Sequence, residues 1–384
     1  MKYDFDHVVN RRGTNSVKFL ESYPDSLEMW IADMDFKVLP EIKEAIKSKA
    51  DIDAYGYCCP KDDYFESYIA WGKKQHNITL KKEWMIFSTG VVASIDSIFK
   101  RLCKPGDEVV MFTPAYNVFF NCIKNNNLKC ASCSFIYKDG EYEIDWNKLE
   151  SLLSRKSVKV FLLCNPHNPS GKIFSQDELI RIGDLAMKHD VLIVSDGIHC
   201  DITRPDKKYV PLLEVEPKYK DHIIMLVSPT KAFNMAGIQS SIIIVPNPKL
   251  KAIIEQGIGA DDLGDPNYFA CEATIAAFNH GAEYNKQLRE YVFKNKQYVE
   301  DFIKDNNLKL HVVGGDATYL MWIDISHYSK DSDKFVKELN ERYHAHLASG
   351  SIYGEEGKTF VRVNVATSLK NVKEFCVRIK NFLN

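Results

Sequence analysis

The sequence predicts an α/β fold in which a mostly parallel sheet is covered by helices on both faces. Short apolar runs rich in β-branched residues alternate with helix-like segments through the middle of the chain, and they lie at 108–112, 158–164, 191–195, 222–227 and 242–246. Runs that are apolar on both faces are typical of the buried strands of a parallel sheet. Because 384 residues exceed what one compact core usually holds, we expect two lobes.

Two helices can be predicted between these strands. Residues 175–189 begin with Ser175 and Glu178, which have the spacing of a capping box, and their apolar residues share one face. Residues 91–103 form a second amphipathic segment, which begins directly after Gly90 and ends at a KPGD turn. Both segments suit helices that pack on a sheet.

The residue pattern changes at about residue 283, where long charged stretches with helical periodicity begin. Residues 318–325 and 359–366 then alternate like strands that are exposed on one face. These features predict a second lobe of the α+β class. We therefore divide the chain into an N-terminal segment that packs with the small domain (1–40), a large domain (41–280) and a C-terminal small domain (281–384).

Composition and charge exclude several classes of protein. The net charge of −2 gives no bias towards nucleic acid or anionic membranes. No run approaches the roughly 18 apolar residues that would cross a bilayer, and the first residues lack the apolar stretch of a signal peptide. The ten cysteines are scattered, and the lone CxxC of Cys130 and Cys133 is a weak zinc or redox signal, so we expect no metal. We expect a protein of the reducing cytoplasm.

Polar residues follow four of the predicted strands at the point where each strand ends. In chain order these are Tyr116, Asn168 within NPHNPSG (165–171), Asp196 and Lys231 within SPTK (228–231). In an open α/β sheet, ligands bind beyond the carboxyl ends of the strands. Each residue alone also suits a structural role in a turn, a helix cap, a core or a solvated hairpin. Their shared position at one rim favours a ligand site.

Together these side chains meet the requirements of pyridoxal 5′-phosphate (PLP). A lysine amine can form a Schiff base with an aldehyde cofactor, and a carboxylate can keep a pyridine nitrogen protonated. An aromatic face can stack on the cofactor ring. The helix that begins after Gly90 offers backbone N–H groups to a phosphate.

Several motifs resemble a known family. The order of NPHNPSG, Asp196 and SPTK is similar to the fold type I PLP enzymes of the class I/II aminotransferase superfamily, and the likeness covers nearly the whole chain. More narrowly, the chain resembles the MalY/PatB-type C–S lyases, which include cystathionine β-lyases and cystalysin-like desulfhydrases. The motifs that carry this resemblance are WIADMDF (30–36), YGY (55–57), TGVV (89–92), SDGIH (195–199), KAFNMAG (231–237), TYLMWID (318–324) and SIYGEEG (351–357). The resemblance implies a large PLP-binding domain, with a mostly parallel seven-stranded sheet between helices, and a smaller α+β domain.

The resemblance also implies a role for each site residue. Lys231 would be the Schiff-base lysine, Asp196 would pair with the pyridine nitrogen and Tyr116 would stack on the ring. The rest of the cofactor would be held by Gly90, Val91, Val92, Ser228 and Thr230 at the phosphate, by Asn168 at the phenolic oxygen, by His199 nearby and by Tyr57 of the neighbouring subunit, which makes the active unit a homodimer. Arg362 would clamp the substrate α-carboxylate, with Ala32 and Asn117 also at the substrate.

The activity implied by the resemblance is that of a C–S β-lyase. It would convert cystathionine, cysteine or a related S-substituted cysteine to pyruvate, ammonia and a thiol. Transamination would use the same residues, so an aminotransferase for an amino acid and a 2-oxo acid is an alternative. A PLP-binding regulator that binds a transcription factor is another.

The sequence departs from the resembled subgroup in three places. Gly197 stands where that subgroup has an acidic residue, and Asn117 stands where it has a second tyrosine. Ser228-Pro-Thr-Lys replaces the commoner Ala-Pro-Ser-Lys and keeps a hydroxyl before the lysine. Asn117 is the departure that bears most on substrate preference.

Overall fold

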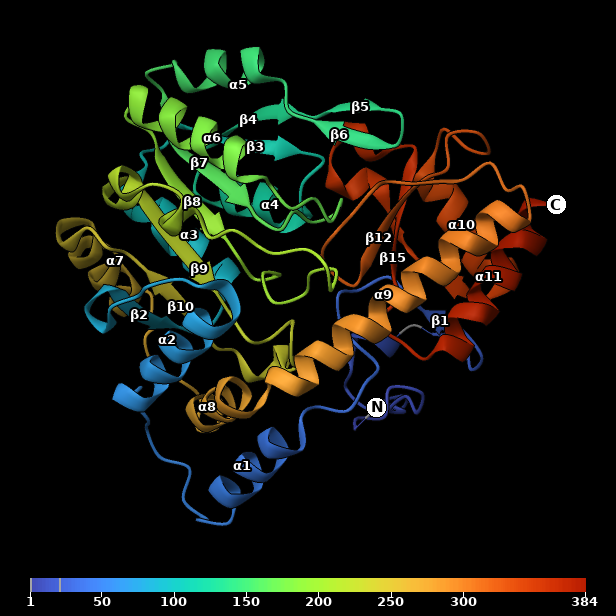
Figure 1. Ribbon diagram of the computed structural model, residues 1–384, viewed down its shortest axis with the longest axis horizontal. Coiled ribbons are helices and arrows are strands. Elements are labelled where there is room, and N and C mark those ends of the chain that lie inside the picture. Colours follow the sequence, from blue (N-terminus) through green and yellow to red (C-terminus); the bar gives the residue numbers. More distant parts are fainter. Residues whose placement is uncertain (1, 21) are drawn as a thin grey trace.

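The computed structural model describes residues 2–20 and 22–384 and consists of two lobes (Figure 1). A 24-residue helix, α9 (Ala282–Asp305), runs from the larger lobe to the smaller one. Among the described residues, no helix is both long and apolar enough to cross a membrane.

The larger lobe is built on a sheet of seven strands in the order β2-β10-β9-β8-β7-β3-β4. The strands are β2 (Met85–Ser88), β3 (Glu108–Thr113), β4 (Lys129–Ser134), β7 (Val158–Cys164), β8 (Leu192–Asp196), β9 (Ile223–Val227) and β10 (Ser241–Ile244). The pairs β3–β4, β3–β7, β7–β8 and β8–β9 are parallel, so the carboxyl ends of these strands meet at one edge. The predicted α/β fold with a mostly parallel sheet is confirmed.

Strand β10, the last of this sheet in chain order, is the exception to the parallel arrangement. It is antiparallel to both β2 and β9, in agreement with the expected sheet that is mostly and not wholly parallel. The connection from β9 to β10 contains only one 3₁₀ turn, Ala236–Ile238. A parallel neighbour needs a crossover, which is usually a helix. Because this connection contains no crossover, β10 begins at the same edge of the sheet at which β9 ends.

Helices cover both faces of the sheet. One face carries α3 (Val91–Leu102), α4 (Asn117–Asn125) and α7 (Pro248–Ala260), and the other carries α2 (Asp62–His76), α5 (Trp146–Leu153), α6 (Gln176–Lys188) and α8 (Ala270–His280), on which α1 (Pro40–Ala50) packs. Successive strand residues face opposite sides, so Val109 packs with α3 while Val110 belongs to the other core. The two predicted helices are confirmed, including the capping box of Ser175 and Glu178.

The smaller lobe contains a four-stranded antiparallel sheet. Its order is β11 (His311–Val312), β12 (Leu320–Asp324), β15 (Phe360–Asn364) and β14 (Ala348–Ser349), and the helices α10 (Ser332–Tyr343) and α11 (Leu369–Leu383) complete the lobe with α9. All five residues of β12 and of β15 are buried, so the expected exposed face is wrong.

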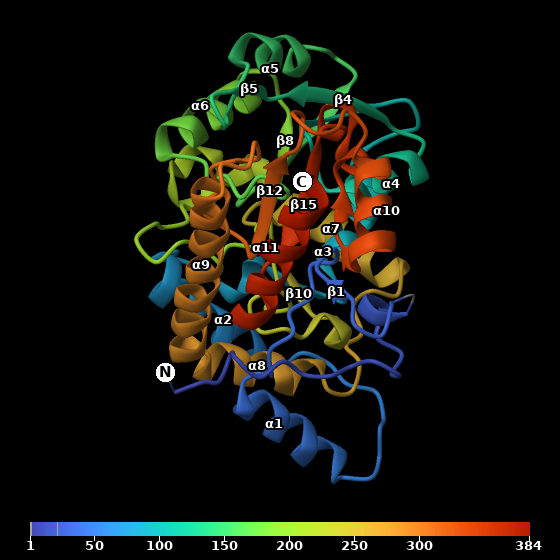
Figure 2. The same cartoon turned by 90° about the vertical axis from the view of Figure 1, so that its right-hand side faces the viewer.

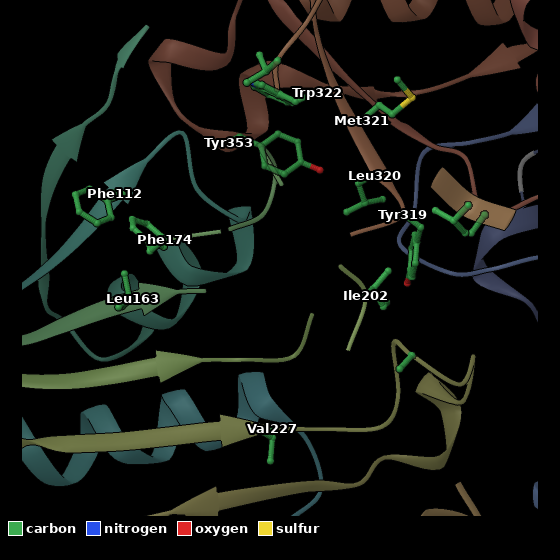
Figure 3. Close-up of a cluster of buried hydrophobic side chains, with 14 of the residues drawn as sticks. Phe112, Leu163, Phe174, Ile202, Val227, Tyr319, Leu320, Met321, Trp322 and Tyr353 are labelled. Atoms are coloured by element: carbon green, nitrogen blue, oxygen red, sulfur yellow. The ribbon is translucent and has the colours of Figure 1, made fainter. Parts of the chain in front are cut away.

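The second face of this small sheet is covered by the larger lobe. A hairpin of β5 (Ile136–Lys138) and β6 (Glu141–Glu143) contributes Tyr142, whose hydroxyl accepts a hydrogen bond from the Trp322 indole at 3.0 Å. Trp322 in turn stacks on Phe360. Figure 3 shows buried side chains of both lobes, with Trp322 and Tyr353 from the smaller lobe and Phe112 and Phe174 from the larger lobe. Packing between lobes therefore buries residues that one lobe alone would expose.

The N-terminal segment lies against the smaller lobe (Figure 2). Strand β1 (Leu27–Glu28) pairs in parallel with β13 (Ala345–His346), and the Asn364 N–H donates to the Met29 carbonyl at 2.8 Å. The division of the chain at residues 40 and 280 stays a prediction.

Candidate active site

A cavity of about 680 Å³ opens at the carboxyl edge of the large sheet. Its lining brings together most of the predicted site residues, namely Ala32, Gly90, Val91, Val92, Tyr116, Asn168, Asp196, His199, Ser228, Thr230 and Lys231. They come from the ends of β3, β7, β8 and β9, from the start of α3 and from the N-terminal segment. The fold thus gathers residues that are up to 199 positions apart in the chain.

Lys231 lies four residues after the end of β9, and its amine points to the N-terminal segment. Nζ donates to the Ala32 carbonyl at 2.8 Å. Removal of the amine from water, together with the positive charge of Arg362, lowers the pKa of Lys231 to about 8. A substantial fraction of neutral amine therefore exists near neutral pH, as a nucleophile or base requires.

Asp196 is the last residue of β8 and is buried at the floor of the cavity. Its Oδ1 accepts a hydrogen bond from the Ile198 N–H at 2.9 Å. Burial raises the pKa of Asp196 to about 6, since this single contact replaces the water that a carboxylate would otherwise bind. A cationic N–H partner in the cavity would restore the charged form, so the residue fits a pyridinium nitrogen.

The start of α3 fits a phosphate group. Gly90 precedes the helix, and no side chain caps its N-terminus. The first-turn backbone N–H groups of Val91 and Val92 therefore face the cavity without intrahelical acceptors. Opposite them, the Ser228 hydroxyl lies 2.7 Å from that of Thr230.

Arg362 lies in the middle of β15 and is 4 % exposed. Nη1 donates to Asn168 Oδ1 at 3.2 Å, and Nη2 donates to the Trp30 carbonyl at 2.8 Å. The guanidinium also lies over the Tyr353 ring, 5.0 Å from its centre. Nε has no hydrogen-bond partner among the described residues, so this buried cation can still bind an anion such as a carboxylate.

With this geometry established, the chain can be compared with known proteins. Residues 25–379 match the family described as aminotransferase class I and II. The chain belongs to this family. It is 34% identical over 386 residues to "Cystathionine beta-lyase PatB" of Bacillus subtilis (strain 168), covering 99% of this chain and 100% of that protein. It is 31% identical to "Protein MalY" of Escherichia coli (strain K12), covering 94% of each chain.

A solved structure agrees with the family. Cystalysin from Treponema denticola, whose crystal structure contains a pyridoxal 5′-phosphate cofactor, matches with a TM-score of 0.95 and 29% identity, covering 100% of both chains. These matches confirm the predicted superfamily and fold type.

Three predicted site residues, Tyr57, Asn117 and Arg362, are not part of the cavity lining. The Tyr57 side chain is fully exposed, and Asn117 is the first residue of α4. Their predicted roles stay predictions, and that of Tyr57 requires a second subunit. Gly197 has little room for a side chain, because a Cβ there would lie 3.1 Å from the Leu226 carbonyl oxygen.

His199 and Tyr116 complete the cavity wall. Burial lowers the pKa of His199 to about 3, so the imidazole is neutral, and its Nδ1 has no partner among the described residues. Burial raises the pKa of Tyr116, whose phenol is therefore protonated at neutral pH. Both rings offer neutral surface and hydrogen-bonding groups to a ligand.

Sequence reasoning missed several residues of the site. The Tyr319 hydroxyl donates to the same Ala32 carbonyl as Lys231, at 3.0 Å, and Gln239 lines the cavity. Tyr353 lies within the quoted motif SIYGEEG, which could have indicated it. Tyr319 likewise lies within the quoted motif TYLMWID, whereas no local pattern marks Gln239, because its place depends on contacts between distant segments.

Gly171, in the loop that carries Asn168, meets the smaller lobe through backbone atoms. A Cβ at Gly171 would lie 2.7 Å from the Ala317 carbonyl oxygen, and one at Gly315 would lie 2.5 Å from the Ser170 carbonyl oxygen. The Ala317 N–H donates to the Gly171 carbonyl at 2.9 Å. Gly171 also has φ +73°, which favours glycine.

A possible metal cluster lies outside the cavity. Among the described residues, His76, Cys200 and Asp201 present ligand atoms within 4.8 Å of one another. His76 Nε2 lies 2.7 Å from Asp201 Oδ1, and the Trp71 indole donates to the same oxygen at 2.8 Å. These groups therefore satisfy one another as a buried hydrogen-bonded cluster.

Proposed function

We propose that the chain is a PLP-dependent carbon–sulfur β-lyase that acts on cystathionine, cysteine or a related S-substituted cysteine to give pyruvate, ammonia and a thiol. The observation that carries the proposal is the convergence on one cavity of the Lys231 amine, the Asp196 carboxylate and the open N-terminus of α3. The lyase class is supported by likeness to proteins named cystathionine beta-lyase and cystalysin.

The residues present fit PLP. Lys231 would hold its aldehyde carbon, Asp196 its ring nitrogen and the N-terminus of α3 its phosphate, with Tyr116 and Asn168 at the ring. When bound, PLP supplies an electron sink for a carbanion beside the substrate amino group.

The side chains of the protein would carry out the remaining tasks. Arg362 would bind the substrate α-carboxylate and so orient the substrate. The amine of Lys231 would take the α-proton as a base. The C–S bond then breaks with its electron pair leaving on sulfur, and water hydrolyses the released enamine to pyruvate and ammonia. The neutral His199 and Tyr116 rings would line the space around the reacting atoms.

We further propose that the active unit is a cytoplasmic homodimer in which Tyr57 reaches the partner's phosphate site. In the single chain the Tyr57 ring is fully exposed, so its apolar surface is in contact with solvent. A second subunit would cover it.

The decisive experiment compares two products. Purified holoprotein is given L-cystathionine or L-cysteine, and pyruvate and ammonia are assayed beside the consumption of an added 2-oxo acid. We expect pyruvate and ammonia in equal amounts without need of a 2-oxo acid. Amino-group transfer to the 2-oxo acid without pyruvate would contradict the lyase and favour the aminotransferase. Borohydride reduction and peptide mapping should locate the cofactor on Lys231.

A further inference from the structure

Residues 30–36, which we call the strap, lie between the small sheet and the loop of Lys231. The strap carbonyl of Trp30 accepts from Arg362 Nη2 at 2.8 Å, and that of Ala32 accepts from Lys231 Nζ at 2.8 Å. The two cations on which the proposed reaction depends are thus each held by a strap carbonyl, two residues apart.

The side-chain amides of Asn364 and Asn234 tie the strap to both of its neighbours. On the side of the small sheet, Asn364 Nδ2 donates to the carbonyls of Ile31 at 2.7 Å and Asp33 at 2.8 Å. On the other side, Asn234, three residues after Lys231, donates to the carbonyls of Met34 at 3.0 Å and Phe36 at 2.8 Å. A shift of the strap would therefore disturb both the small sheet and the loop of Lys231.

Three ion pairs hold the strap, namely Arg11 with Asp33, Arg11 with Asp35 and Lys18 with Asp35. Arg11 Nη1 contacts both oxygens of Asp33, at 3.0 and 2.8 Å. Lys18 Nζ contacts Asp35 Oδ1 at 2.7 Å and the Asp33 carbonyl at 3.0 Å. The side chain of Lys18 is 1% exposed, which is rare for a lysine unless it is paired. These four charges lie outside the lining of the catalytic cavity.

We propose that Arg11 and Lys18 are positioning residues that, through Asp33 and Asp35, set the strap carbonyls that orient Arg362 and Lys231. The inference rests on the proposed function, because it concerns how that reaction's base and carboxylate clamp are placed. One strap serves both cations, so loss of the network should impair turnover and substrate binding together. The negative charge of Asp33 also raises the pKa of Lys231 against the larger effect of burial.

The first test uses steady-state kinetics of the holoenzyme. Lys18→Met should lower kcat and raise KM, with a combined loss in kcat/KM of about 10- to 100-fold, because misplaced groups cost that much in catalysis. Lys37→Met changes an exposed lysine of the adjoining segment and should leave both constants within twofold of wild type. Wild-type kinetics in Lys18→Met would overturn the proposal.

A double variant separates positioning from stability. Lys18→Met removes the nearer cationic partner of the buried Asp35 carboxylate and leaves Arg11 Nη2 at 3.4 Å, which destabilises the fold. Adding Asp35→Asn removes that charge, so Tm should recover most of the loss while kcat and KM stay impaired. Recovery of wild-type kinetics together with Tm would show that the pair only stabilises the chain.

The second test does not depend on turnover. The full chain without added cofactor is labelled with trace acetic anhydride across a pH range, and peptide mass spectrometry follows Lys231. Asp33→Asn should shift the titration of Lys231 to lower pH than in wild type and in Lys37→Met, since a nearby negative charge is lost. An unshifted profile would overturn the inference. If wild type releases no pyruvate while the shift is seen, the proposed function fails and the role of the strap stands.

Discussion

The two walls of the cavity are built in different ways. On the wall of the larger lobe, Asp196 ends a parallel strand, and Asn168 and Lys231 each follow one by four residues. The wall on the side of the smaller lobe consists of the strap, whose Ala32 lines the cavity, and of Arg362, which contacts the lining residue Asn168 and lies over the Tyr353 ring. Its hydrogen bonds span up to 332 positions in the chain. Short connections to a rigid sheet fix the first wall, whereas the second depends on contacts between segments. Changes in the first wall should therefore abolish chemistry, and changes in the second should alter how substrate is held.

Lys231→Ala should have the largest effect, because it removes the base from the first wall. We expect lyase activity to fall by about 10⁴-fold, the upper range for loss of general base catalysis. Pyruvate release measures the loss, and Lys304→Ala, an exposed lysine, serves as the control. Activity within tenfold of wild type would show that another group takes the proton.

Asp196→Asn should lower the activity of the enzyme but raise the stability of the cofactor-free chain at high pH. Loss of the charge at the ring nitrogen should lower activity by about 10²- to 10³-fold. In the chain without cofactor, the raised pKa of Asp196 means that the fold favours its neutral form, so the stability linked to it is present below about pH 4 and is lost as pH rises through about 6.

The stability of Asp196→Asn therefore depends on pH. At pH 8 the cofactor-free variant should exceed wild type in free energy of unfolding by up to roughly 3 kcal/mol, since the pKa is raised by about two units. Below pH 4 the difference should vanish. Urea titrations at the two pH values measure it, and an excess that persists at low pH would assign the gain to packing.

Arg362→Ala tests the second wall. We expect KM for amino acids to rise by roughly 10- to 100-fold, the value of hydrogen bonds to a charged group, while cofactor retention stays near wild type. Arg362→Lys keeps the charge but not the planar guanidinium, so its KM should lie between that of wild type and that of Arg362→Ala. Equal loss of cofactor, seen by absorbance after dialysis, would place Arg362 in the first wall.

Tyr353 should give the smallest effect. Tyr353→Leu removes the ring beneath Arg362 and should raise KM by about three- to tenfold, in line with a partly buried cation–π contact. Tyr353→Phe keeps the ring and should stay within twofold of wild type. A similar KM rise in both variants would instead assign the effect to the hydroxyl.

Local patterns explain what could be predicted from the sequence. Strand-end residues such as Asp196 and the capping box of Ser175 depend on a few neighbouring positions, and both were found. The sequence alone does not specify which strand is antiparallel, because the direction of β10 depends on whether the preceding connection crosses the sheet. The burial of β12 and β15 on both faces was missed because the second face is covered by Tyr142 and its hairpin in the other lobe. Tyr319 and the Lys18–Asp35 pair were missed for the same reason, since their partners lie far away in the chain.

The glycine contact between the lobes has a consequence for protein engineering. Where Gly171 meets Gly315, the spacing of the two segments is set by peptide groups, so no side chain can be trimmed or enlarged to adjust it. Loop grafts intended to change substrate range would have to transplant both segments as one unit, and libraries that diversify either glycine would mostly yield misassembled clones.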